Sequence, residues 1–448
     1  MKLEGFKENT KKKIIVISFT VLCLLLIAGV YLYTSYAFYE ETKNFNVING
    51  TVEDPGDLYF AYYVDGKISR TMPSKNIGYT LDTTKSSCDN GVTVDWDYSK
   101  WKANIYYENY SATDKTRTKC TLFFNKTAKT VKTALGNIEV NSYKPDLTKS
   151  ACDTSNCESH EKGIFETTDA DGTSYYYRGA VENNYLKFAG YFWRVVRING
   201  NGSIRIIYDG TSAHANGESS ADRQYGTSQF NTSAGNNMYV GYMYTSGEAH
   251  GTGTSSAIKT NADKFYTDKL SSYASKLDTN AGFCGDRSNL NQQSGVGTGT
   301  VITYNKGYLR VEESAPTLTC ENASDYYTVA SASSGNKKLS YPIGLITADE
   351  VMLAGHAGGV FDGSYNHMKS NNGSYLVTGN AFWTMTPAGG YNPFGNAYWY
   401  AGVFYVLSSG YIDDGGTNYT GGLRPVVNLK SGVTITGSGT KTNPYVVS

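Results

Sequence analysis

Aromatic and amide side chains are concentrated in one stretch near the C-terminus of this 448-residue chain. Residues 389–412, GGYNPFGNAYWYAGVFYVLSSGYI, include eight aromatic residues and no charged residue. Tyrosine and tryptophan offer large contact areas at a small entropic cost, and asparagine adds adaptable hydrogen bonds. This combination is typical of surfaces that recognise a ligand.

The first half of the stretch predicts a loop, because Gly, Asn or Pro recurs every two or three positions. The second half, VFYVLSSGYI, predicts two strands around Ser409 and Gly410. A second membrane span is excluded, because no apolar run approaches the roughly 18 residues required. Either the aromatics fill the base of a loop-rich domain or they are displayed to a ligand. Display predicts the binding residues Tyr391, Asn392, Phe394, Asn396, Tyr398, Trp399, Tyr400 and Tyr411.

Cysteine usage indicates export. Cys23 lies in an apolar N-terminal segment, which leaves six cysteines in the rest of the chain. An even number in an exported region favours disulfides, although many connectivities are open in principle. A zinc site is not expected, because there is no Cys-x-x-Cys and the five histidines are scattered. Proximity predicts three pairs: Cys88 with Cys120, Cys152 with Cys157, and Cys284 with Cys320.

Catalytic and metal-binding patterns are weak. The chain has no Gly-x-Ser-x-Gly, and His356, the best single candidate for a general base, follows a predicted helix whose end already explains it. Asp169 and Asp171 precede Gly172 like a fragment of a calcium loop, and Asp413 and Asp414 precede two glycines, but turns explain both. We therefore expect no catalytic residue, metal ligand or cofactor, with calcium as a weaker alternative.

The charge balance gives no reason to expect nucleic acid as a partner. Lys plus Arg and Asp plus Glu both total 40, and the glycines form no phosphate-binding fingerprint. Arg194, Arg197 and Arg205 fall on predicted strands, where solvated or ion-paired positions explain them better than a polyanion site does.

The N-terminus predicts a membrane anchor. Lys7, Lys11, Lys12 and Lys13 precede residues 14–38, IIVISFTVLCLLLIAGVYLYTSYAF, in which no charge interrupts 25 positions. About 20 apolar residues cross a bilayer, and the positive-inside rule places the short tail in the cytoplasm and the bulk outside. A signal peptide cleaved after Ala37 is the alternative. We expect a single-pass protein of the cell membrane with an extracellular bulk.

The remaining sequence suggests a modular chain. An Asp65-Gly66 turn between aromatic strands predicts a β-hairpin. Helices are expected at 255–277 and at 347–355, where Thr347 and Glu350 match a capping box. The predicted divisions are a cytoplasmic tail (1–13), a transmembrane signal anchor (14–38), a stalk (39–56), a small all-β module (57–127), a linker (128–150) and an antiparallel α+β domain (151–448). The alternative for the strand-like NIEVNSY within the linker is that it joins the next domain.

A family resemblance covers nearly all of the last 300 residues. The motifs YLKFAGYFWRVVRINGNGSIRIIYDG, FCGDRS, YPIGLITADEVMLAG, FWTMTP, LRPVVNL and GSGTKTNPYVV look like a domain of uncharacterised surface proteins from Gram-positive bacteria. That domain is distantly similar to C-type-lectin-like and formylglycine-generating-enzyme-like folds. The resemblance implies a lectin-like α+β fold in the cell envelope. It does not carry over the formylglycine activity, because this chain has no cysteine after Cys320.

These observations predict a membrane-anchored, non-catalytic binding or adhesion protein. Its expected ligand is a carbohydrate, the cell wall or a protein, held by the aromatic loop surface, with stacking on sugar rings as one mode. The alternatives are an enzyme, such as a hydrolase, that modifies envelope polymers, and a structural protein that assembles with copies of itself.

Overall fold

A computed structural model describes residues 58–73, 79–98, 100–107, 117–126, 128–141, 144–148, 151, 162–290, 303–330, 335–356, 374–391 and 400–448. The predicted membrane anchor and stalk lie outside these residues, as do Cys152, Cys157 and loop positions 392–399. Within the described residues, none of the helices has the length and apolar character to cross a bilayer. The chain divides into two compact units, of which the first ends at Lys126 and the second begins at Thr127.

The first unit is a small β-module. Asp65 and Gly66 form the predicted two-residue turn, and both have the positive φ angles, 49° and 76°, that a type I′ turn requires. The hairpin β5–β6 places Trp96 edge-on to Phe124, with ring centroids 5.0 Å apart. The strands are β1 (Leu58–Val64), β2 (Lys67–Ser69), β3 (Tyr79–Leu81), β4 (Ser87–Cys88), β5 (Thr93–Asp97), β6 (Lys102–Tyr106) and β7 (Thr118–Lys126), with sheet order β2-β1-β7-β3 and β4 also on β7.

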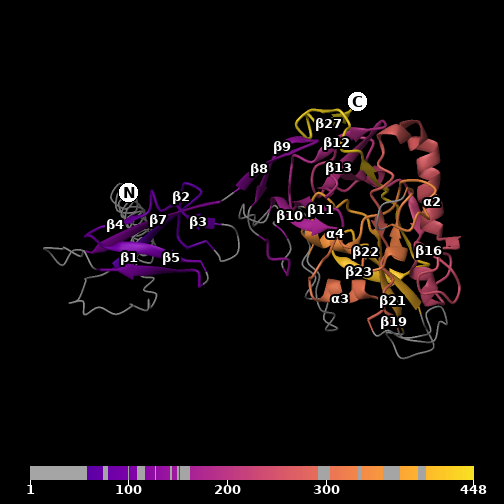
Figure 1. Ribbon diagram of the computed structural model, residues 1–448, viewed down its shortest axis with the longest axis horizontal. Coiled ribbons are helices and arrows are strands. Elements are labelled where there is room, and N and C mark those ends of the chain that lie inside the picture. Colours follow the sequence, from indigo (N-terminus) through magenta and orange to yellow (C-terminus); the bar gives the residue numbers. More distant parts are fainter. Residues whose placement is uncertain are drawn as a thin grey trace, which may run out of the picture. The chain divides into compact units, whose positions relative to one another are not determined.

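A ten-stranded sheet forms one layer of the second unit (Figure 1). Its central strand β13 is buried along most of its length because β-branched and aromatic residues fill both of its faces. The strands run in the order β26 (Ile435–Thr436), β27 (Tyr445–Val447), β12 (Tyr185–Phe188), β13 (Tyr191–Ile198), β11 (Gly172–Arg178), β10 (Gly163–Asp169), β9 (Gly136–Asn141) and β8 (Ala128–Thr133), with β14 (Ile204–Gly210) joining β13 to β25 (Val426–Leu429).

A second, six-stranded sheet contains the strands that flank the aromatic segment. The predicted strand pair around Ser409 and Gly410 is confirmed as β22 and β23, whose connecting turn is closed by a hydrogen bond from the Leu407 amide to the Tyr411 carbonyl. The order is β15 (Thr227–Gln229), β24 (Thr420–Gly422), β21 (Phe382–Tyr391), β22 (Tyr400–Val406) and β23 (Ile412–Gly416), with β19 (Thr303–Tyr304) on β21. Two further pairs are β16 (Met243–Tyr244) with β17 (Thr254–Ser255), and β18 (Phe283–Cys284) with β20 (Tyr326–Tyr327).

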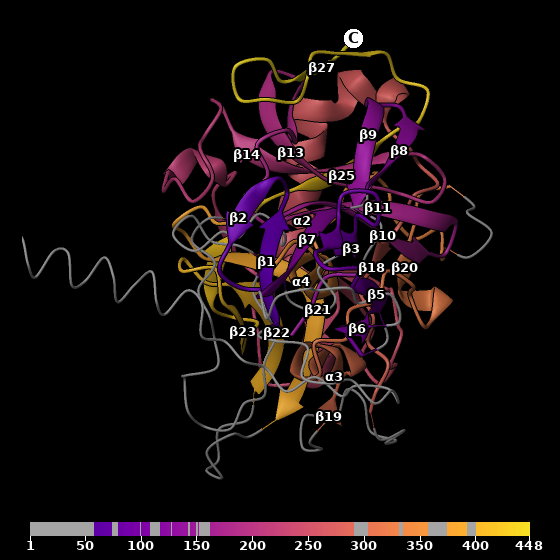
Figure 2. The same cartoon turned by 90° about the vertical axis from the view of Figure 1, so that its left-hand side faces the viewer.

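Short helices pack among these strands (Figure 2). The predicted helix over 255–277 is α-helical only in α2 (Ala257–Phe265) and continues as a π-helical turn and a 3₁₀ segment to Lys276. The capping box is confirmed: Thr347 and Glu350 exchange side-chain and backbone hydrogen bonds at the start of α4 (Ala348–Leu353). The third α-helix in the described part of the chain is α3 (Lys306–Glu312).

The predicted α+β class is wrong, because the described part of the chain is mostly β. Its three α-helices have only nine, seven and six residues. Its strands, numbered β1 to β27, far outnumber them. One apolar core joins both sheets of the second unit with α2 and α4, including Trp193, Phe265 and Trp383. The two helical patterns form only short helices, and many short β-rich segments around them form strands.

The segment predicted as a linker also differs. Residues 128–141 form the hairpin β8–β9, and β9 pairs with β10 through Asn141 and Phe165, so this segment belongs to the second unit. Ile138 and Val140 are buried there, which ties the hairpin to the core. The strand-like stretch thus joins the following domain, the alternative that the sequence left open.

Two of the predicted disulfides are confirmed, Cys88–Cys120 in the first unit and Cys284–Cys320 in the second. The third predicted pair, Cys152–Cys157, lies outside the described residues. Structural disulfides persist in oxidising compartments, so these bonds indicate an extracellular or secreted protein.

Candidate functional site

Tyrosines and carboxylates lie on both faces of the strand pair β22–β23, in the turn that follows β23, on β19 and in α3, around the two strands that flank the predicted aromatic loop. β21 ends and β22 begins at this loop, β19 pairs with the end of β21, and α3 packs beside it (Figures 1 and 2). We call these side chains the tyrosine–carboxylate surface; its members are Tyr304, Tyr308, Glu312, Tyr405, Asp413, Asp414 and Tyr419.

The backbone of α3 at Gly307 approaches β21 closely, and this contact holds the helix against the sheet. A Cβ atom on Gly307 would lie 2.5 Å from Cγ2 of Thr386 and 2.9 Å from the carbonyl oxygen of Pro387. Only glycine therefore allows the first turn of α3 to lie against β21. The neighbouring residue, Tyr308, is thereby held next to the strand-borne Tyr304, with ring centroids 4.9 Å apart.

One part of the surface lies on the α3 side of the sheet. The ring centroid of Tyr308 is 6.3 Å from that of Phe404, which pairs across the strands with Asp414. Burial raises the pKa of Tyr308, and the nearby charges of Glu312 and Asp414 raise it further. Both tyrosine hydroxyls of this part stay protonated at neutral pH and can donate a hydrogen bond.

The other part lies on the opposite face of β22 and β23. Tyr405 stands opposite Asp413 and donates a hydrogen bond from Oη to Oδ2 at 3.3 Å. Tyr419 is 59% exposed, and its ring lies against Gly415, where a Cβ atom would come within 3.3 Å of it. Burial raises the pKa of Asp413, opposed by hydrogen bonds from the Asp414 amide and Tyr405.

The chemistry of this surface is that of polar recognition. Its tyrosines supply flat apolar area with a hydroxyl at the tip, and its three carboxylates supply acceptors for hydroxyl or ammonium donors. Among the described residues there is no group of three or more His, Cys, Asp or Glu that could hold a metal ion. The described side chains of this surface can form hydrogen bonds and can stack against a ligand.

The predicted binding residues are placed only in part. Tyr391 ends β21 and pairs with Tyr400 at the start of β22, so the two lie side by side in the backbone. Tyr411 lies in the turn before β23 and is partly exposed. The remaining predicted residues, Asn392, Phe394, Asn396, Tyr398 and Trp399, lie outside the described residues.

Sequence reasoning missed Tyr304 and Tyr308, which precede the aromatic segment by more than 80 positions. Tyr304 reaches the segment through the β19–β21 pairing, and Tyr308 reaches it through the contact of its ring with Phe404. It also did not name Tyr405, which lies in a predicted strand, or Tyr419, which follows the glycines that end β23. Tyr304 lies on β19 and Tyr308 in α3, so no single helical or strand periodicity marks the pair in the sequence. Asp413 and Asp414 were noted as calcium candidates and instead flank tyrosines.

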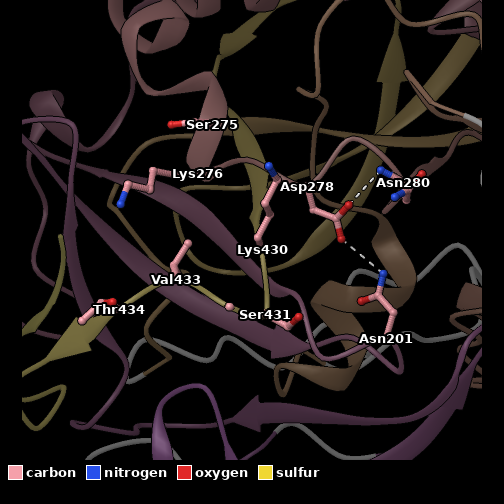
Figure 3. Close-up of a pocket in the computed structure, with 10 residues that line it drawn as sticks. Asn201, Ser275, Lys276, Asp278, Asn280, Lys430, Ser431, Val433 and Thr434 are labelled. Atoms are coloured by element: carbon pink, nitrogen blue, oxygen red, sulfur yellow. Dashed lines mark hydrogen bonds between the residues drawn. The ribbon is translucent and has the colours of Figure 1, made fainter.

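A polar pocket of about 660 Å³ lies elsewhere on the second unit (Figure 3). Three segments form it: the β13–β14 turn, the chain after α2, and the chain after β25. Asp278 lies within it and accepts hydrogen bonds from Nδ2 of Asn201 at 3.2 Å and from the Asn280 amide at 2.8 Å. The lining residues are Asn201, Ser275, Lys276, Asp278, Asn280, Lys430, Ser431, Gly432, Val433 and Thr434.

The histidines that the structure describes have structural partners. His356, the candidate base, is buried against the Gly410 carbonyl and lies 2.9 Å from Oγ of Ser374. Burial lowers its pKa to about 4, so it is a neutral core residue at physiological pH. His214 contacts two carboxylates, and His250 contacts Asp325, which also accepts from an arginine.

The arginines on the predicted strands are ion-paired and buried. Arg197 contacts Asp169 at 2.8 Å and Glu350 at 2.9 Å, and Arg205 contacts the same Glu350 oxygen at 2.7 Å. Asp169 also accepts a hydrogen bond from the Gly200 amide. An ion pair and a turn thus account for Asp169, one of the calcium candidates.

No protein-family model matches this chain, and the curated proteins and the solved structures likewise contain no match. The candidate site therefore rests on its own geometry.

Proposed function

We propose that this chain is an exported binding protein that recognises a saccharide, cell-wall or protein ligand through the tyrosine–carboxylate surface and the adjoining aromatic loop. The observation that supports the proposal most is the exposed Tyr419, which lies in the turn after the edge strand β23, near the bonded pair Tyr405 and Asp413. The same sheet also holds both ends of the loop. The two disulfides agree with a place outside the cytoplasm.

A sugar ring fits this chemistry well. Tyrosine faces can stack on the apolar face of a pyranose, while carboxylates accept from its hydroxyls. Tyr419, in the turn between β23 and β24, is exposed beside Tyr405 and can contact such a ring.

Anchoring in the cell membrane is part of the proposal. Residues 14–38 form an uninterrupted apolar segment preceded by lysines, which supports a single-pass anchor with the cytoplasm on its N-terminal side. The resemblance to surface proteins of Gram-positive bacteria supports the same location.

Retention on insoluble polysaccharides tests the binding surface. The full chain in mild detergent is mixed with peptidoglycan, chitin and cellulose, and bound protein is compared for the native chain, Tyr419→Ala, Asp413→Asn and Trp399→Ala. The first two variants should weaken retention roughly tenfold, as expected for residues at the centre of an interface. Trp399→Ala tests the predicted loop separately.

A matched control is Tyr273→Ala, because Tyr273 is also an exposed tyrosine of the second unit, with 40% of its surface accessible. It should bind as the native chain does. Equal retention of Tyr419→Ala, Asp413→Asn and the control, or no retention on any of the three polymers, contradicts saccharide binding by this surface.

A further inference from the structure

The polar pocket shown in Figure 3 has a preformed frame. The Asp278 amide donates to the Asn428 carbonyl at 2.7 Å, and the Lys430 amide donates to the Lys276 carbonyl at 2.9 Å. Between these bonds, Leu277 bridges to Leu429, and both leucines are fully buried. Backbone bonds and an apolar floor therefore fix two walls of the pocket without a ligand.

The central carboxylate of the pocket is held in place and keeps capacity for more donors. Asn201 donates to one oxygen of Asp278 and the Asn280 amide to the other. An ionised carboxylate has about four acceptor positions, so each oxygen can accept a further hydrogen bond. A ligand hydroxyl is the neutral donor that fits this arrangement.

Two lysines line the pocket together with this single carboxylate. Lys276 contacts the carbonyl oxygen of Ser448. Lys430 is exposed, and its Nζ makes no hydrogen bond or ion pair with any residue in the described part of the chain. Ser275, Ser431 and Thr434 add hydroxyl groups around the rim. Lys430 is thus a cation that an anionic group of a ligand can reach.

The lining excludes several classes of ligand. It contains no aromatic side chain on which a nucleobase could stack, and Val433 is its only large apolar residue. It contains one carboxylate, fewer than the oxygen cage of a divalent cation requires. What remains is a small, strongly polar molecule with hydroxyl groups and a negative charge.

We infer that this pocket binds an acidic sugar or polyol, with its carboxylate or phosphate on Lys430 and its hydroxyls on Asp278 and Asn201. The inference goes beyond the proposed function, because no residue of the tyrosine–carboxylate surface lines the pocket. The two sites belong to different sheets of the second unit and can be tested apart.

Calorimetric titration of the full chain in mild detergent tests the inference with D-glucuronate, D-glucose 6-phosphate and D-glucose. Both acids should bind in the millimolar range and more tightly than glucose. Lys430→Gln should weaken the two acids about tenfold, the effect of losing a charged hydrogen bond, and leave glucose unchanged. Asp278→Asn should weaken all three compounds. The two acids separate carboxylate recognition from phosphate recognition.

Two controls keep the outcomes distinct. Lys338→Gln changes an exposed lysine that does not line the pocket and should bind as the native chain does. Tyr419→Ala should leave the binding of D-glucuronate and D-glucose 6-phosphate unchanged. A loss of function at the tyrosine–carboxylate surface can then be distinguished from a loss of binding in the pocket. Absence of saturable binding of both acids at millimolar concentration, or equal affinity of the native chain and Lys430→Gln, overturns the inference.

Discussion

Single buried carboxylates each bind several arginines in the second unit. Asp209 accepts from Arg223 and Arg424 at 2.9 Å, and Nη1 of Arg194 lies 3.9 Å from its other oxygen. All four side chains are at most 1% exposed. Burial lowers the pKa of Arg424 to about 9, which shows how poorly the surroundings accept its charge. One anion therefore compensates three buried cations.

Removing the charge of Asp209 should destabilise the fold strongly. Asp209→Asn leaves three buried guanidinium groups without a counter-charge, and breaking a buried pair in this way costs about 3–5 kcal/mol. Urea unfolding followed by circular dichroism should show a much lower midpoint for this variant. Asp268→Asn removes a carboxylate from the exposed pair with Lys264 and should not move the midpoint. Equal midpoints for both variants contradict the role assigned to Asp209.

Acid sensitivity should report on Glu350. Burial favours its neutral form, but Arg205 and Arg197 lower its pKa from the ordinary 4.5 to about 2. Because the folded-state pKa is the lower one, its stabilisation is complete above pH 4.5 and is lost as pH falls toward 2. The loss amounts to about 3 kcal/mol. The difference in unfolding free energy between the native chain and Glu350→Gln should shrink by that amount from pH 5 to pH 2; a constant difference refutes it.

At the scale of elements, the Cys284–Cys320 bond joins β18 to the chain after α3. Its cysteines are 36 positions apart, and closing a loop of that length in the unfolded chain is worth about 4 kcal/mol in the chain-entropy account. The double variant Cys284→Ser with Cys320→Ser should melt at a lower temperature than the native chain without reductant. Adding reductant should then lower the melting temperature of the native chain more than that of the variant. If reductant lowers the melting temperature of the native chain and of the variant equally, the Cys284–Cys320 bond does not contribute to thermal stability.

Local elements with a short sequence signature could be predicted. Asp65-Gly66 defined a hairpin, Thr347 and Glu350 defined a helix start, and neighbouring cysteines in an exported chain defined two disulfides. Each depends on residues close in sequence or on one pairing rule. The length of α2 could not be predicted in the same way, because the apolar pattern continues to Leu277 while the backbone changes its helical type at Tyr266.

Features that depend on long-range pairing escaped prediction. Tyr304 joins the aromatic segment through one β-bridge to Gly389, and Asn201 reaches Asp278 across 77 positions. No local periodicity encodes such contacts. The predicted aromatic loop itself remains a prediction, since only Tyr391, Tyr400 and Tyr411 fall within the described residues. The sequence thus located the strands that flank the site, and the structure added the side chains around them.

At the scale of the whole molecule, recognition of a ligand outside the cell requires the bulk of the chain to lie outside the cytoplasm. Protease added to intact cells that express the full chain should remove both disulfide-bonded units and leave a short membrane-bound fragment. A cytoplasmic protein in the same cells serves as the control and should stay intact. A chain that is digested only after the cells are lysed contradicts export.

The most direct test of the binding surface is hydrogen–deuterium exchange of the full chain with and without the polysaccharide that retains it. Peptides covering α3 and the segment from β23 to β24 should exchange more slowly when the ligand is bound, because ligand contacts restrict water and local opening there. Peptides from β12 and β13, in the other sheet, should be unaffected. Protection confined to other parts of the chain contradicts the assignment of ligand binding to the tyrosine–carboxylate surface.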